Sequence, residues 1–217
     1  MYNEGTEAER GVFMRKLAKC CLVLLLLCGI LAAPTVYRGY HLYKNAVGNV
    51  SVEQKVEEIR RNGNFIPLSD MDEYFVDEII ASEDKRFYLH FGVDPLAVAR
   101  AVKNDILAGS FVEGGSTITQ QLAKNMYFDF EKVMERKVAE VFVAFQLEKK
   151  YTKDEILEMY LNSIYYGENC YGIKEAAGYY YNKQPGELTK QQSDSLVHTI
   201  KCPNLYNPVA LAAEQGV

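Results

Sequence analysis

The sequence lacks tryptophan, has three histidines and contains no Cys-x-x-Cys or His-x-x-x-His spacing that would indicate a zinc site. It also lacks internal repeats and low-complexity linkers, and no run of alternating apolar and polar residues predicts a β-sheet. Its 217 residues allow one domain with an appendage and exclude a large multidomain protein. Because 48% of the residues are hydrophobic, the chain is not a disordered protein.

The formal net charge of −5 is the sum of two regions of opposite sign. Residues 1–44 carry a net charge of +3, whereas residues 45–217 carry −8. An acidic body excludes a nucleic-acid-binding protein that works by bulk positive charge. No nucleic acid is therefore expected among the partners.

A long apolar run lies near the N-terminus. It begins at Cys20 and continues through Tyr37 as 18 residues without a charge. As a helix it would span about 27 Å, close to the thickness of a hydrocarbon core. Four basic residues precede it within ten positions, and the tyrosines at 37, 40 and 43 suit the outer interface. The run predicts an uncleaved signal anchor, with residues 1–19 in the cytoplasm and residues 45–217 outside it, on the membrane surface.

Three other interpretations of this run are weaker. A cleaved signal peptide would place Leu31 where a small residue is needed, with Pro34 just after the cut. A lipoprotein cysteine at Cys28 would follow Leu27 instead of a small residue. A buried core helix would not be so uniformly apolar.

Beyond the run only two cysteines remain, Cys170 and Cys202, and either a disulfide or two free thiols fits them.

Hydrophobic periodicity predicts helices nearly throughout the rest of the chain, and therefore a mainly α fold. Asp94-Pro95 is an N-cap followed by proline at the first helical position, and Gly109 would end that helix. Thr152 with Glu155 forms a capping box. The expected helices are 51–62, 70–83, 95–107, 116 or 117 to 126, 131–150, 152–162, 171–181 and 189 to just before Pro203.

The first chemically suggestive stretch follows the second of these helices. Glu83 and Asp84 stand where an apolar face ends, with His90 and Gly92 close behind. Two adjacent carboxylates cannot both ionise cheaply, so one pKa tends to be raised, which suits a general acid or base. Taken alone, the stretch fits a solvated helix end better.

A second stretch runs from Glu113 to Asn125 and combines a glycine pair with hydroxyl, amide and ammonium side chains. Backbone N–H groups at a glycine-rich helix start suit phosphate oxygens, so an anion or sugar site is one interpretation. A loop followed by a capped polar helix is the other. Gln120 and Gln121, inside an otherwise apolar pattern, weigh mildly against it.

The third stretch places Arg136 and Glu140 four residues apart, on one helix face with Lys132. It fits either an exposed ion pair, worth a few tenths of a kcal/mol, or a cationic row that binds a diphosphate. A fourth stretch, 153–167, reads as structural, with a core stripe and with Asn162 and Gly167 at turns.

In this order and spacing, the stretches resemble the peptidoglycan glycosyltransferases of glycosyltransferase family 51 over about residues 65–210. The first family motif, Glu-Asp-x-x-Phe-x-x-His-x-Gly, is matched by Glu83, Asp84, Phe87, His90 and Gly92. The second is matched by Gly114 and by Ser116 to Gln121, with Lys124 and Asn125 beyond, and the third by Arg136, Lys137 and Glu140. The fourth is matched by Ile156 to Glu158 and Tyr160 to Asn162, and a looser fifth by Tyr171, Gly172, Ala176, Ala177 and Tyr181.

The resemblance implies a transmembrane helix followed by a lysozyme-like helical domain with a small membrane-associated jaw. The implied division is a cytoplasmic tail at 1–19, the anchor at 20–37, a membrane-proximal linker and helix at 38–64, and the glycosyltransferase domain at 65–217. The implied reaction polymerises lipid II into β-1,4-linked strands with inversion and releases polyprenyl diphosphate. Its partners are lipid II, the growing strand and the bilayer, with cell-wall synthesis or division proteins as further candidates.

The resemblance also implies roles for particular residues. Glu83 would be the base that deprotonates the acceptor 4-hydroxyl, and Glu140 would stand near the donor diphosphate, assisting its departure or holding a divalent ion (Mg or Mn). Lys132 keeps the charge of an arginine common at that position in the family but loses its bidentate fork. The implied substrate-binding residues are Asp84, Phe87, His90, Gly92, Gly115, Ser116, Thr117, Gln120, Gln121, Lys124, Asn125, Lys132, Arg136 and Lys137.

Alternatives stay open at this point. No Ser-x-x-Lys or Lys-Thr-Gly motif of a transpeptidase follows, so the chain is read as a monofunctional enzyme or as a piece of a bifunctional penicillin-binding protein. A membrane-anchored lytic glycosidase would also use a glutamate in a lysozyme-like fold, although it would have no diphosphate to bind. A non-catalytic scaffold would have no need of both Glu83 and Glu140.

Overall fold

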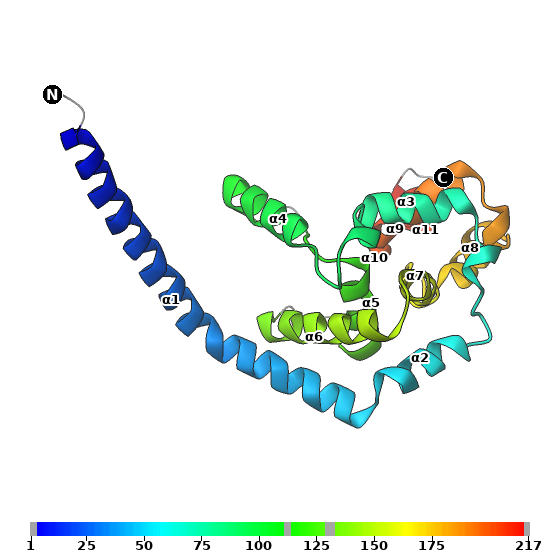
Figure 1. The fold of residues 1–217 in the computed structure, drawn as a ribbon. Coiled ribbons are helices and arrows are strands. Elements are labelled where there is room, and N and C mark those ends of the chain that lie inside the picture. Colours follow the sequence, from blue (N-terminus) through cyan, green and yellow to red (C-terminus); the bar gives the residue numbers. More distant parts are fainter. Residues whose placement is uncertain (1–3, 111–113, 129–132, 215–217) are drawn as a thin grey trace.

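Figure 1 shows the computed structural model of the chain, which describes residues 4–110, 114–128 and 133–214. Within the first helix, the side chains at 4–12, 21, 24 and 25 are not described. The α-helices are α1 (Glu4–Asn49), α2 (Val52–Arg60), α3 (Glu73–Glu83), α4 (Pro95–Ala108), α5 (Ile118–Tyr127), α6 (Met134–Lys150), α7 (Lys153–Leu161), α8 (Ile173–Tyr181), α9 (Lys190–Lys201), α10 (Pro203–Tyr206) and α11 (Pro208–Glu214). Short 3-10 turns are η1 (Leu68–Asp70), η2 (Phe87–Leu89) and η3 (Pro185–Glu187).

The mainly α prediction is confirmed, since the described ranges contain two isolated β-bridges and no strand. Helices α4 and α7 begin at the N-cap residues that the sequence predicted. Asp94 accepts hydrogen bonds from the N–H groups of Leu96 and Ala97, and Thr152 forms its capping box with Glu155. Gly109 ends α4 in the left-handed conformation, at φ +64°. The architecture is consistent with a lysozyme-like helical domain.

The N-terminal helix differs from expectation in its length. Residues 38–49, part of the expected membrane-proximal segment, continue α1 without a break, and Pro34 lies inside the helix. No helix in the described ranges is both long enough and apolar enough to cross a membrane. The predicted anchor at 20–37 is therefore not confirmed, and it contains three of the residues whose side chains are not described.

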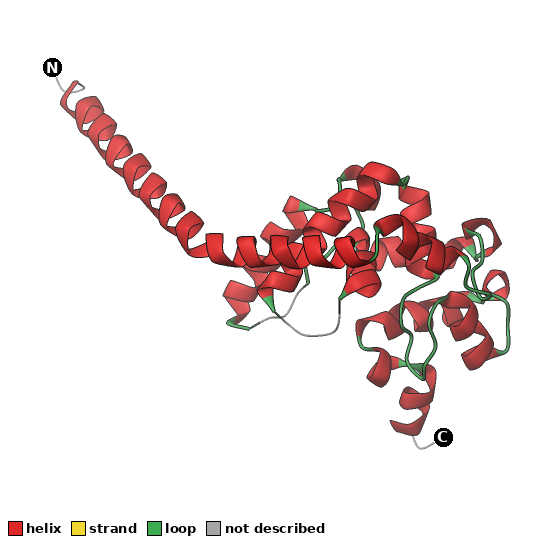
Figure 2. Cartoon of the chain, turned by 90° about the horizontal axis from the view of Figure 1, so that it is seen from below, coloured by secondary structure: helices red, strands yellow, loops and turns green. Residues whose placement is uncertain are grey.

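The second half of α1 packs along α6, and Figure 2 shows it lying against the helical body. A Cβ atom on Gly39 would lie 2.5 Å from the Cβ of Val138, so glycine is what lets the two backbones approach. The ring of Tyr43 stacks on Phe142, and the ring of Tyr40 meets the same Phe142 edge-on. Two of the three tyrosines expected at a membrane interface therefore contact α6.

Packing in the hydrophobic core brings parts of helices α3, α5 and α6 close together. Fully buried apolar side chains from α3, α5, α6 and α7 (Ile79, Leu122, Leu147 and Leu157) belong to a single cluster. This packing brings together the C-terminal end of α3, the first turns of α5 and the middle of α6. Helix α4 stands apart from the body in Figure 1.

Candidate active site

Glu83 is the last residue of α3, and a two-step hydrogen-bond chain holds it from behind. Gln121 Nε2 donates to Glu83 Oε2 at 2.8 Å, and Tyr160 Oη donates to Gln121 Oε1 at 3.1 Å. Tyr160 is fully buried, and this burial, assisted by the nearby Glu83 charge, raises its pKa well above the ordinary value. The phenol therefore stays protonated and donates.

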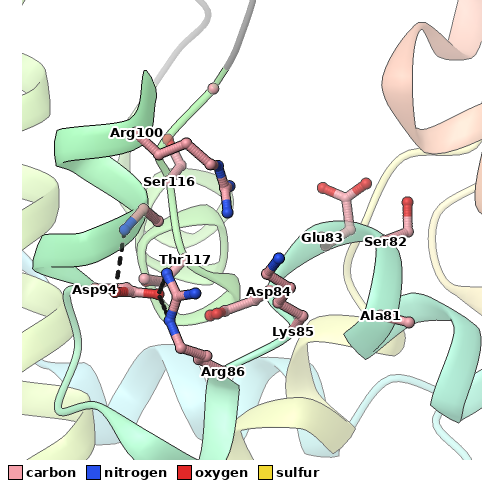
Figure 3. Close-up of a pocket in the computed structure, with 12 residues that line it drawn as sticks. Ala81, Ser82, Glu83, Asp84, Lys85, Arg86, Asp94, Arg100, Ser116 and Thr117 are labelled. Atoms are coloured by element: carbon pink, nitrogen blue, oxygen red, sulfur yellow. Dashed lines mark hydrogen bonds and ion pairs between the residues drawn. The ribbon is translucent and has the colours of Figure 1, made fainter. Parts of the chain in front are cut away.

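Asp84 points away from Glu83 and into the protein, as Figure 3 shows. Its carboxylate accepts the N–H of Ile118 at 3.1 Å and contacts His90 Nε2 at 2.9 Å. Burial raises the pKa of Asp84, while His90 and the Ile118 N–H oppose the rise. The expectation that one carboxyl of the pair has a raised pKa is thus met at Asp84, but the cause is burial and not repulsion between the two neighbours.

The other first-motif residues support this corner. Phe87 is fully buried, with Lys153 Nζ 4.4 Å from its ring centroid. Gly92 has φ +72°, a conformation that favours glycine, and its carbonyl accepts the hydroxyl of Thr117 at 2.6 Å. His90 Nδ1 is buried without a partner within the described residues. The observed contacts of these residues are with the protein, and their contact with substrate stays a prediction.

Some residues of the second motif support the fold, and others face the cavity. Thr117 caps α5 in a capping box with Gln120, and both side chains are buried. A Cβ on Gly115 would lie 3.1 Å from the Cα of Val98, so this glycine allows the chain to approach α4 closely. Ser116 faces the cavity, where its Oγ accepts a hydrogen bond from Lys137 Nζ at 2.6 Å.

Glu140, in the middle of α6, lies between two cations. Arg136 Nε is 3.0 Å from Glu140 Oε1, and Lys137 Nζ is 2.7 Å from Oε2. Glu140 is 1% exposed, so the solvated-face interpretation of this ion pair is wrong. Lys124 lies nearby, and burial lowers its pKa against the opposing effect of Glu140. Lys132 lies outside the described residues.

Three adjoining cavities connect these groups. The largest, of about 700 Å³, contains both Glu83 and Glu140, and shares Glu83, Ser116 and Arg100 with a second of about 340 Å³, drawn in Figure 3. A third, of about 370 Å³, contains Asn125 and shares Gln121 and Lys124 with the largest. Glu83 thus stands at a junction, with the cations of α5 and α6 on one side. The largest cavity is lined by Ser82, Glu83, Arg100, Gly114, Ser116, Gln121, Lys124, Arg136, Lys137, Glu140, Ile200 and Lys201.

The fourth stretch is structural, as expected, with one exception. The side chain of Asn162 donates to the carbonyl of Ile66 at 2.9 Å and accepts its N–H at 3.0 Å. Tyr160, expected only as part of the core stripe, reaches the site through Gln121. Sequence reasoning also missed Arg100 of α4 and Lys201 of α9, which line the cavity from helices that carry no motif.

The described side chains do not form a protein cage for a divalent ion. No group of three or more His, Cys, Asp or Glu side chains placed to hold a metal occurs in the described ranges. Both carboxylate oxygens of Glu140 are already in contact with cations. As placed, Glu140 therefore offers no free carboxylate oxygen to an ion, and the positive charge on the described lining of the cavity comes from its own lysines and arginines. Cys170 and Cys202 are both free thiols.

Comparison with known proteins agrees with the motifs. A family model described as transglycosylase matches residues 49–216. Over 162 residues the chain is 44% identical to penicillin-binding protein 1F of Bacillus subtilis, covering 73% of this chain and 23% of that protein. Over 145 residues it is 46% identical to penicillin-binding protein 1A of Neisseria lactamica, covering 67% and 18%. The chain thus spans about a fifth of the length of these curated relatives.

Proposed function

The chain belongs to the transglycosylase family, and from that membership we propose that it is a peptidoglycan glycosyltransferase that polymerises lipid II into β-1,4-linked glycan strands. The observation that carries the proposal is one cavity of about 700 Å³ that is lined both by Glu83 and by Lys124, Arg136 and Lys137. A base and an anion site side by side are what a sugar-diphosphate donor and a hydroxyl acceptor require.

In the proposed reaction, the acceptor 4-hydroxyl oxygen attacks C1 of the donor sugar and passes its proton to Glu83. The bond from C1 to the diphosphate oxygen breaks, its electron pair leaves with polyprenyl diphosphate, and the configuration at C1 inverts. Gln121 donates a hydrogen bond to Glu83 Oε2. The other carboxylate oxygen, Oε1, has no hydrogen-bond partner among the described residues and is the one that takes the proton.

The cations act on the leaving group. Charge develops on the diphosphate as the bond breaks, and preorganised Lys124, Arg136 and Lys137 stabilise it. Glu140 holds Arg136 and Lys137 in place and reduces their mutual repulsion. A lytic glycosidase, which cleaves a neutral bond, has no use for this cluster.

The membrane relationship is part of the proposal. Residues 20–37 of α1 would anchor the chain with residues 1–19 in the cytoplasm and the 65–217 domain outside it. Exposed apolar side chains on α4, including Leu96, Val102, Ile106 and Leu107, suit a jaw that dips into the bilayer holding the polyprenyl tail. Protease treatment of spheroplasts tests this: an N-terminal tag should be protected and the 65–217 domain digested, and the opposite pattern would refute the topology.

The deciding experiment incubates the full chain with labelled lipid II in detergent or vesicles and separates the products. Long glycan strands and free polyprenyl diphosphate support the proposal. Unchanged lipid II, together with disaccharide-sized fragments from preformed glycan, would instead identify a lytic glycosidase.

A further inference from the structure

Tyr160 lies behind the proposed base and is connected to it through a single amide. The phenol oxygen lies 3.1 Å from Gln121 Oε1, and Gln121 Nε2 lies 2.8 Å from Glu83 Oε2. Tyr160 belongs to α7, Gln121 to α5 and Glu83 to α3, so the two hydrogen bonds link three separate helices. Tyr160 does not line the cavity and is fully buried, so it has no direct access to substrate.

The chemistry of the three side chains determines which group donates and which accepts in each of these two hydrogen bonds. An ionised carboxylate only accepts hydrogen bonds, so Gln121 must present its NH₂ group to Glu83. The amide oxygen of Gln121 then faces Tyr160, which must donate. Burial favours the neutral, donating phenol. A flipped amide would place its oxygen against the Glu83 carboxylate, so the carboxylate excludes that orientation, and the hydrogen bond donated by the phenol holds the amide in the productive one.

We propose that Tyr160 is a positioning residue for catalysis: through Gln121 it fixes the orientation of the Glu83 carboxylate and leaves Oε1 as the oxygen that takes the acceptor proton. This inference rests on the proposed function, in which Glu83 is the base. Without the phenol, the amide can rotate, and Glu83 loses the donor that holds Oε2.

The chain offers a matched control in Tyr166. This residue is also fully buried, and the Glu83 charge likewise contributes to the rise of its pKa. Unlike Tyr160, its hydroxyl has no hydrogen-bond partner within the described residues. Tyr160→Phe and Tyr166→Phe therefore each remove one buried hydroxyl near Glu83, but only the first breaks the connection to Gln121.

The test measures kcat and KM for lipid II polymerisation with the full chain and its variants, each checked for folding by circular dichroism. Tyr160→Phe should lower kcat about tenfold, part of the roughly 10²- to 10⁴-fold that a positioned base contributes, and leave KM within about twofold. Tyr166→Phe should leave both constants unchanged. In a Gln121→Ala background, Tyr160→Phe should cause no further loss, because the two residues act as one unit.

A kcat for Tyr160→Phe within about twofold of the parent, an equal loss in Tyr166→Phe, or additive losses with Gln121→Ala would each overturn the inference. Should Tyr160→Phe not fold, Gln121→Met removes both hydrogen bonds at similar length, and an unaltered kcat in that variant would overturn it instead. Glu83→Gln distinguishes a failure of the positioning role of Tyr160 from a failure of the proposed base. If that variant is inactive while Tyr160→Phe is normal, only the positioning role fails, whereas an active Glu83→Gln removes the proposed base itself.

Discussion

The two glutamates that line the cavity have different hydrogen-bonding and charged partners. At the end of α3, Glu83 is partly exposed and receives one hydrogen bond from a neutral amide. In the middle of α6, Glu140 is almost completely buried and touches a guanidinium and an ammonium group. Of the two glutamates that line the cavity, Glu83 is therefore held by a neutral donor and Glu140 by two cations.

This difference supports the proposed roles of the two glutamates. A carboxylate with a free oxygen and a neutral partner can exchange a proton with a substrate hydroxyl. A buried carboxylate between two cations stabilises a cluster that would otherwise repel itself, and removing it leaves two partly exposed cations without their counter-charge. Glu83 is thus suited to proton transfer and Glu140 to holding charge.

Replacing Glu140 should produce the largest loss of stability. Glu140→Gln leaves Arg136 and Lys137, whose side chains are 16% and 37% exposed, without their counter-charge. Because water partly solvates both cations, the loss should lie near the lower end of the roughly 3–5 kcal/mol that breaking a fully buried pair costs. Urea unfolding followed by circular dichroism measures this difference.

Glu135→Gln on the same helix is the matched control. Glu135 lies 3.7 Å from Arg38, whose side chain is 72% exposed, and such a pair is worth about 0–1 kcal/mol. Equal unfolding free energies for the two variants would remove the distinction between the buried and the exposed pair.

The close contact between α1 and α6 can be tested by changing α1 alone. Gly39→Ala places a methyl group against Val138 and should destabilise the protein by about 1–3 kcal/mol through overpacking. Gly48→Ala, where nothing lies within 4 Å of the added methyl, should be neutral or slightly stabilising. Thermal melts of the two variants decide, and a Gly39→Ala melting temperature at or above that of the parent would show that the close approach does not matter.

The smallest expected effect concerns the pH dependence of anion binding. Burial lowers the pKa of Lys124, so this lysine loses its proton at a lower pH than an exposed lysine as the pH rises. Affinity for a diphosphate lipid should therefore fall a few-fold in the alkaline range. Lys124→Arg should shift that fall to higher pH, because a guanidinium stays protonated.

Lys149→Arg, at the exposed end of α6, serves as the control and should leave the pH profile of the parent unchanged. Calorimetric titration across the alkaline range measures both variants. Identical profiles for Lys124→Arg and the parent would mean that Lys124 does not contact the anion.

Sequence predicted the parts of this molecule that depend on local chemistry. The caps at Asp94 and Thr152 and the left-handed Gly109 follow from hydrogen bonds and backbone preferences within a few residues. The motifs likewise brought Glu83, Ser116, Gln121 and Glu140 into one predicted site, and the structure places all four around one cavity.

The remaining features depend on contacts between distant segments. Periodicity identifies Tyr160 as buried, but only the packing of α7 against α5 shows that its hydroxyl meets Gln121. Arg100 and Lys201 lie in stretches without a motif, so no local signal marks them as lining the cavity. The continuation of α1 to Asn49 is supported by its contacts with α6, which lies about a hundred residues further along the chain.

The most direct test of the division of roles compares Glu83→Gln with Glu73→Gln, an exposed position on the same helix, in three measurements on the same preparations. Glu83→Gln should lower strand synthesis from lipid II by about 10²- to 10⁴-fold. It should keep the unfolding free energy and the affinity for a diphosphate lipid close to those of Glu73→Gln. Strand synthesis by Glu83→Gln at a rate near that of Glu73→Gln would contradict the assignment of Glu83 as the base.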